Sequence, residues 1–175
     1  MNFCPNHFQG ISFFSSVMTR RPDSFANICG SDDFPDIRGQ VRLFQTRYGV
    51  LLVTEVFGLP REYVECSESI FAYHIHEGDD CSGNMSDPFA DAMAHYNPDN
   101  CEHPAHAGDL PPLFGNDGYA FSAFLTDKFC ACEVIGRTII IHRNPDDFTT
   151  QPSGNSGAKL PVASFKEPDP YLLFH

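Results

Sequence analysis

The sequence predicts an all-β protein, an antiparallel sandwich or barrel built from eight short strands and two long loops. Three observations lead to this prediction. The apolar runs are short and rich in Val, Ile, Phe and Tyr, which favour strands. The chain contains 14 prolines and 13 glycines, and they interrupt these runs along its whole length. The stretches 77–109 and 143–157 are polar and have the length of functional loops.

The first half of the chain carries an extension and then four predicted strands. Residues 1–23 are expected to be irregular or partly helical. Strands are predicted at 25–31, 38–46 and 49–60, because each is a β-rich run that ends near Gly, Pro or Asp. Arg47-Tyr48-Gly49 predicts a tight hairpin between the second and the third strand.

The fourth strand is predicted over residues 69–76, SIFAYHIH. Side chains alternate along a strand, so Phe71, Tyr73 and Ile75 share one face. Ala72, His74 and His76 share the other face. One side of this strand is therefore apolar, and the other carries two imidazoles.

The remaining strands follow the first long loop. They are predicted at 110–114, 119–125, 137–142 and 159–165, with a turn at 115–118 and a connector at 130–136. We expect one domain over residues 24–166, preceded by the extension 1–23 and followed by a tail, 167–175.

Composition excludes several classes of partner. The net charge is −12, from 23 acidic and 11 basic residues, which argues against nucleic acid and anionic membranes. No apolar run approaches the roughly 18 residues of a membrane span. No basic region precedes an apolar core at the N-terminus, so we expect no secretory signal and a cytoplasmic location.

Histidines cluster in one part of the chain. Five of the eight lie between Phe71 and Leu110, where Asp109 is also found, and His142 ends a later strand. His74 and His76 project from the same strand face, a geometry that suits one metal ion, although a strand can carry such a pair for polar contacts alone. His95, His103, His106 and Asp109 make a His₃Asp set that fits a tetrahedral zinc site.

Four segments resemble the copper/zinc superoxide dismutase family in their order and in most of their spacings. They read FAYHIHEG, HYNPDNCEHPAHAGDL, VIGRTIIIHRNPDDF and GNSGAKL, and the resemblance covers roughly residues 25–166. It implies an eight-stranded Greek-key β-barrel with a metal-binding loop and an electrostatic loop. It also implies an antioxidant oxidoreductase that converts superoxide, its substrate, to O₂ and H₂O₂ with copper and zinc as cofactors.

The resemblance assigns a role to each ligand. Copper would be bound by His74, His76, His95 and His142. Zinc would be bound by His95, His103, His106 and Asp109. His95 would therefore bridge the two ions and act in catalysis by delivering a proton, and Asp146 would link a copper histidine to a zinc histidine.

Three features depart from the family pattern. Lys159 stands where the family has an arginine that guides superoxide, and lysine lacks the planar donor fork, so reduced but not abolished activity is expected. Only two residues separate His103 from His106, where many members have a longer insert, so the loop must turn sharply there. The family disulfide partner of Cys81 would fall near Val162, so we expect a bond between Cys81 and Cys101 instead.

Two other readings stay open from the sequence. One is a copper- and zinc-binding reservoir of the same fold without useful turnover, which the lysine and the missing disulfide partner favour. The other is a β-sandwich interaction module without metal, which leaves the histidines unexplained. A monomer and a homodimer are equally compatible with the sequence.

Overall fold

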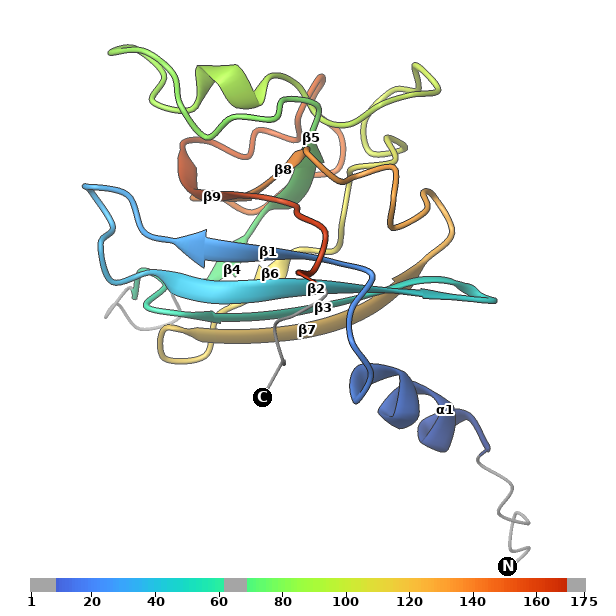
Figure 1. Cartoon of the computed structure of the whole chain (residues 1–175). Helices are drawn as coiled ribbons and strands as arrows, with labels where there is room; N and C mark the ends of the chain where they lie inside the picture. The colour runs from blue at the N-terminus through green and yellow to red at the C-terminus, as the bar shows by residue number, and fades with distance from the viewer. Residues whose placement is uncertain (1–8, 62–68, 170–175) are drawn as a thin grey trace, which may run out of the picture.

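The structure is a computed structural model that describes residues 9–61 and 69–169 (Figure 1). Its strands form two layers. The lower layer in Figure 1 is an antiparallel sheet in the order β1-β2-β3-β7, made by Ser24–Cys29, Arg38–Thr46, Gly49–Phe57 and Tyr119–Thr126. The upper layer has the order β5-β8-β9, made by Tyr73–His76, Thr138–His142 and Lys159–Ser164. The strands β4 (Ile70–Phe71) and β6 (Leu113–Phe114) pair with each other in a separate, two-stranded sheet.

The predicted strands are found, with two differences. Of the strand predicted at 110–114, only Leu113–Phe114 (β6) is observed. β2 covers the predicted range, and Thr46 pairs with Gly49 across the expected hairpin. The fourth predicted strand is divided at Ala72 into β4 and β5. The backbone of Ala72 leaves the ladder because it bonds to Asn144 and His142 instead, with N···O distances of 2.8 Å in both bonds. The chain therefore crosses from one sheet to the other at this residue.

The main core lies between the two layers. Its side chains follow the strand period of two, as Val41 and Leu43 do on β2 and Val50 and Leu52 on β3. From β4 and β5, Phe71, Tyr73 and Ile75 enter this core, which confirms the predicted apolar face. The opposite face of β5 is left to His74 and His76.

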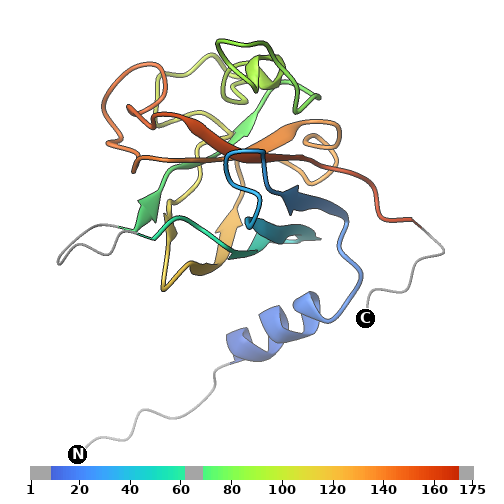
Figure 2. The ribbon, with the colours of Figure 1, turned by 90° about the vertical axis from the view of Figure 1, so that its left-hand side faces the viewer.

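A second, smaller apolar cluster lies on the outer face of the first sheet. Helix α1 (Gln9–Met18) covers this face, as Figure 2 shows from the side. Val17 of the helix packs with Phe44, Leu51 and Val53. The helix falls within the extension expected over residues 1–23, of which residues 1–8 lie outside the described part of the chain, and it buries apolar side chains that the sheet would otherwise expose to water.

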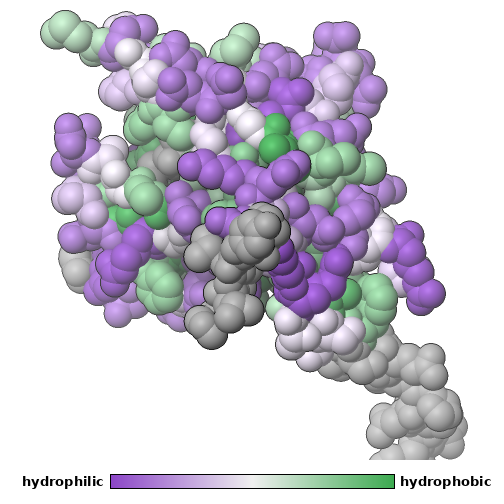
Figure 3. Space-filling model, viewed as in Figure 1, coloured by the Kyte–Doolittle hydropathy of each residue, from purple (hydrophilic) through white to green (hydrophobic). Residues whose placement is uncertain are grey.

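The sandwich does not close into a complete barrel. Phe25 of β1 and Lys166, which follows β9, form an isolated bridge and exchange two backbone hydrogen bonds, of 3.1 and 2.8 Å. The fold is a Greek-key antiparallel sandwich, as predicted. No helix within the described ranges is long and apolar enough to cross a bilayer. The face seen in Figure 3 is mostly hydrophilic, in keeping with the high net charge.

Candidate metal centre

Two groups of metal-ligating side chains adjoin each other beside β5. The first group is His74, His76, His95 and His142, and the second is His95, His103, His106 and Asp109. Within each group, one ligand atom from every residue lies within 4.8 Å of the others. The structure therefore brings together every predicted metal ligand, and His95 belongs to both groups.

The first long loop reaches the site by running alongside β5. Ile75 donates to Gly108 O over 2.9 Å and accepts from Tyr96 N over 2.8 Å. These bonds place His95 opposite His76 and Asp109 opposite His74. Gly108 is required here because a Cβ atom would lie 2.2 Å from the Ile75 carbonyl oxygen. The glycine directly before Asp109 is thus explained by a close backbone contact.

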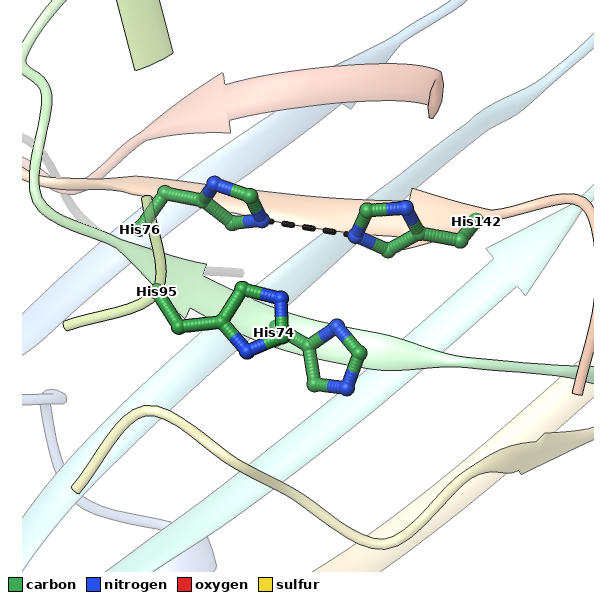
Figure 4. Close-up of side chains that lie close together, drawn as sticks. All are labelled: His74, His76, His95 and His142. Atoms are coloured by element: carbon green, nitrogen blue, oxygen red, sulfur yellow. Dashed lines mark hydrogen bonds between the residues drawn. The ribbon is translucent and has the colours of Figure 1, made fainter. Parts of the chain in front are cut away.

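The four histidines of the first group converge from two strands and one loop (Figure 4). His76 Nε2 and His142 Nε2 lie 3.3 Å apart, and the rings of His74 and His95 are 3.9 Å apart. His74 Nδ1 and His95 Nε2 are buried without a hydrogen-bond partner. Buried polar atoms are normally paired, so these two free lone pairs are what a metal ion would satisfy.

Burial keeps three of these imidazoles, those of His74, His76 and His142, neutral. It lowers the pKa of His76 to about 3 and that of His142 to about 2, and it lowers the pKa of His74 as well. A neutral imidazole can donate a lone pair to a metal, whereas a protonated one cannot. These three ligands are therefore ready to bind a metal at neutral pH.

Asp109 organises the second group. Its carboxylate accepts from His95 Nδ1 over 2.8 Å and from the backbone N–H of His106 over 3.0 Å. His103 Nδ1 lies 3.1 Å from the same carboxylate but without hydrogen-bond geometry. Burial opposes ionisation of Asp109, but the histidine contacts outweigh it and lower its pKa to about 2. The group thus offers one carboxylate and three imidazoles as ligands, which fits zinc.

Asp146 links the two groups. It accepts from His74 Nε2 over 2.8 Å and from His103 Nε2 over 2.9 Å. These bonds place the proton of each ring on Nε2 and leave Nδ1 free as a ligand atom. Gly154, at φ 65°, makes room for this carboxylate, since a Cβ atom there would lie 1.9 Å from Asp146 Oδ1. Asp146 therefore joins one histidine of each ligand group.

Lys159 lies at the edge of the histidine cavity. It pairs with His142 across β8 and β9, and its Nζ donates to Asp87 Oδ2 over 2.8 Å and to Phe89 O over 2.9 Å. The cavity has a volume of about 520 Å³ and is lined by His76, His95, His106, His142 and Lys159, among other residues. Lys159 is the only lysine or arginine among the residues that line it.

Two side chains that bind residues of the second ligand group, Gln151 and Lys128, were not predicted from the sequence. The side chain of Gln151 forms two hydrogen bonds with the backbone of His103. It accepts from the His103 N–H over 3.0 Å and donates to the His103 carbonyl over 2.7 Å. Lys128 Nζ donates to the carbonyl of His106 over 3.0 Å. Both side chains bind main-chain atoms, so neither belongs to a residue motif. Only the three-dimensional arrangement of the loops identifies them.

The predicted disulfide between Cys81 and Cys101 is wrong in this structure, where both residues are free cysteines. Cys81 turns toward β9, with its Sγ 3.5 Å from Ser164 Oγ. Cys101 is exposed in a turn that the side chain of Asn97 closes, with a Cys101 N···Asn97 Oδ1 distance of 2.9 Å. The two thiols thus belong to separate parts of the long loop.

Met93 has a strained backbone at the rim of the cavity. Its φ of 63° and ψ of −153° fall in a region that is almost restricted to glycine, and its carbonyl accepts from His76 Nδ1 over 2.9 Å. We expect Met93→Gly to stabilise the protein. Release of about 1–3 kcal/mol of strain should exceed the roughly 1 kcal/mol by which glycine favours the unfolded chain.

Urea unfolding of the metal-free protein measures the effect of Met93→Gly. The matched control is Met85→Gly, at a fully exposed methionine of the same loop whose φ is not positive. Met85→Gly should lower the midpoint slightly, because it loses chain entropy without releasing strain. A lower midpoint for Met93→Gly would contradict the strain argument.

Fold and site together define a class of protein, a Greek-key β-sandwich with two adjoining metal sites that share one histidine. Residues 37–164 match the family model described as copper/zinc superoxide dismutase (SODC). The chain belongs to the copper/zinc superoxide dismutase family. This family uses copper and zinc, and the two groups of ligands can hold metal ions.

Individual relatives agree with the family assignment. The chain is 31% identical over 139 residues to "Superoxide dismutase [Cu-Zn] 1" of Aquifex aeolicus, covering 70% of this chain and 76% of that one. It is 30% identical over 165 residues to "Superoxide dismutase [Cu-Zn]" of Legionella pneumophila, covering 90% and 94%. Both relatives are matched over most of their length.

Solved structures support the fold. The Cu/Zn superoxide dismutase of Brucella abortus superposes with a TM-score of 0.67 at 22% identity, covering 81% of this chain and 98% of that one. A SOD-like protein from Bacillus subtilis superposes with a TM-score of 0.64 at 26% identity, covering 80% and 96%.

Proposed function

We propose that this protein is a superoxide dismutase, which converts two superoxide anions and two protons to O₂ and H₂O₂. Copper would be held by His74, His76, His95 and His142, and zinc by His95, His103, His106 and Asp109. Bound copper would supply the one-electron redox chemistry, and bound zinc would fix and polarise the shared imidazole. The observation that carries this proposal is the pair of ligand groups that meet at His95.

His95 is the residue through which this chain would move a proton. Its Nδ1 is held by Asp109, and its Nε2 is buried and faces the first group without a partner. A ring that is fixed at one nitrogen can take up and release a proton at the other nitrogen without moving far. His95 Nε2 is therefore the atom from which we expect the reduced product to receive a proton.

The cavity would bind and orient the substrate. Superoxide is a small anion, and an ammonium group at the cavity edge attracts it by charge. Lys159 Nζ uses two of its three N–H groups on Asp87 and Phe89. One N–H group remains for an anion. The lysine would thus give charge and one hydrogen bond, where an arginine would give a planar fork.

Metal analysis coupled to a superoxide assay tests the proposal. The protein is loaded with copper and zinc, its metal content is measured, and superoxide decay is followed by stopped flow against the metal-free form. Stoichiometric metal with fast decay supports the enzyme. Stoichiometric metal without superoxide decay would favour a metal-binding reservoir of the same fold. The ion pair between Lys159 and Asp87 favours this alternative, because the charge that would attract superoxide is already paired.

Lys159→Arg is expected to raise kcat/KM by about three- to tenfold, because a bidentate donor orients the anion better than a point charge. Steady-state superoxide decay measures the effect. Arg137→Lys is a matched control, because Arg137 is held by the carbonyls of Glu133 and Glu77 and does not line the cavity. An unchanged or lower kcat/KM in Lys159→Arg would count against an orienting role at this position.

Three expectations remain predictions beside this function. They are a cytoplasmic location, a monomeric or homodimeric state, and the division into 1–23, 24–166 and 167–175. Fractionation, light scattering and limited proteolysis, respectively, test them.

A further inference from the structure

We propose that Asp87 is a positioning residue that both fixes the ammonium group of Lys159 and weakens its attraction for anions. This inference rests on the proposed function, because it concerns how an anionic substrate is drawn to the same cavity. Asp87 lies in the first long loop, 72 residues before Lys159. It belongs to no ligand group in the described part of the chain.

The geometry shows that the lysine is held. Lys159 Nζ donates to Asp87 Oδ2 over 2.8 Å and to Phe89 O over 2.9 Å. Asp87 is itself fixed, because its Oδ1 accepts from the backbone N–H of Phe89 over 3.0 Å and its N–H donates to Asn84 Oδ1 over 3.1 Å. A flexible side chain is thus held in one position by a rigid turn.

The negative charge of Asp87, in contrast, weakens the attraction of Lys159 for an anion. The side chain of Lys159 is 18% exposed and that of Asp87 is 43% exposed, so water screens their charges only in part. Among the described residues that line the histidine cavity, Lys159 is the only lysine or arginine. It also lines a second cavity of about 810 Å³ beside it, whose lining has three acidic side chains, Asp32, Asp33 and Asp87. The charge of Lys159 is therefore already paired with Asp87, and Asp32 and Asp33 of the second cavity add negative charge that repels an approaching anion.

The two effects of Asp87 can be separated by substitution. Asp87→Asn keeps an oxygen that can accept from Lys159 Nζ but removes the negative charge. Asp87→Ala removes both the charge and the acceptor, so only Phe89 O still holds the ammonium group. The inference therefore predicts that the asparagine variant has the highest anion affinity and that the alanine variant falls below it.

Azide titration of the copper- and zinc-loaded protein, followed by visible absorption, measures anion affinity without turnover. At about 10 mM salt we expect Asp87→Asn to bind azide about threefold more tightly than the unaltered chain. This gain should shrink at about 300 mM salt, where charges are screened over a few ångströms. Asp87→Ala should bind azide at least about twofold more weakly than Asp87→Asn.

Two controls make the result specific. Asp91→Asn removes one charge from an exposed aspartate of the same loop that lines neither cavity, and it should leave azide affinity unchanged. In a Lys159→Gln background, Asp87→Asn should lose most of its effect, because the charge that Asp87 neutralises is gone. Together these variants form a double-mutant cycle. Azide affinity is compared per bound copper, so the test stays valid if one variant binds less metal.

Several results would overturn the inference. If Asp87→Asn binds azide no more tightly than the unaltered chain, Asp87 does not weaken the attraction of Lys159 for anions. If Asp87→Ala binds azide as tightly as Asp87→Asn, Asp87 has no positioning role. A gain that persists in the Lys159→Gln background would show that Asp87 does not act through the lysine. Absence of superoxide decay with the predicted azide order would instead reject the enzyme and leave the inference about Asp87 standing.

Discussion

Replacing His142 with alanine is expected to abolish superoxide turnover and to release copper, while zinc stays bound. His142 belongs only to the first ligand group, and its side chain is buried. Loss of a partner outside the ligand set typically costs 10- to 100-fold in metal affinity or activity, so loss of a direct ligand should cost more than about 100-fold. Metal analysis after dialysis and superoxide decay on the same sample measure both effects.

His106→Ala is the matched control for this prediction. His106 belongs only to the second group and is equally buried, so its loss should lower zinc affinity and leave copper bound. The two variants should therefore lose different metals. If His142→Ala released zinc and copper together, or neither, the assignment of the two groups to different ions would be wrong.

Most of the ligand set could be predicted from the sequence because its members lie in local motifs. His74 and His76 occupy alternate positions on one strand, and strand geometry alone places them on one face. His103, His106 and Asp109 lie within one short segment, so few chain conformations can separate them. The resemblance added His142 and Asp146, which come from another part of the chain.

The supporting contacts could not be predicted because they depend on how two loops meet. Gln151 binds the backbone of His103, and Lys159 binds Asp87, across 48 and 72 residues of sequence. Neither contact follows from residue type, since any polar side chain in a loop can bond to any peptide group. The failed disulfide prediction has the same cause. Cys81 and Cys101 share a loop, but the fold turns Cys81 toward β9.

The strand prediction failed at one residue for a similar reason. Ala72 has an ordinary strand sequence on both sides, and its alternation is correct. It leaves the ladder because Asn144, in the second long loop, supplies the carbonyl for its N–H. Its carbonyl accepts from His142 at the end of β8, so both partners of Ala72 are distant in sequence and no local pattern indicates them.

Ser164→Cys is expected to create a disulfide with Cys81 and to stabilise the oxidised protein by about 2–4 kcal/mol. Cys81 Sγ and Ser164 Oγ already lie 3.5 Å apart, and they join the first long loop to β9. The resemblance implies a disulfide between these same two elements, with its strand end near Val162, and Ser164 is two residues from that position. This bond would enclose more than 80 residues, so it would strongly restrict the unfolded chain.

The stabilisation should depend on oxidation. Burial raises the pKa of the Cys81 thiol, so little thiolate is present at neutral pH and an added oxidant is needed to form the bond. Urea unfolding should show a higher midpoint after oxidation, and a reducing agent should remove the gain. Ser164→Ala controls for the loss of the bond from Ser164 Oγ to Asp79 O, and should show no gain under either condition. Titration of free thiols decides the outcome: an oxidised variant with no fewer free thiols than its reduced form would show that the Cβ atoms are not aligned for a disulfide.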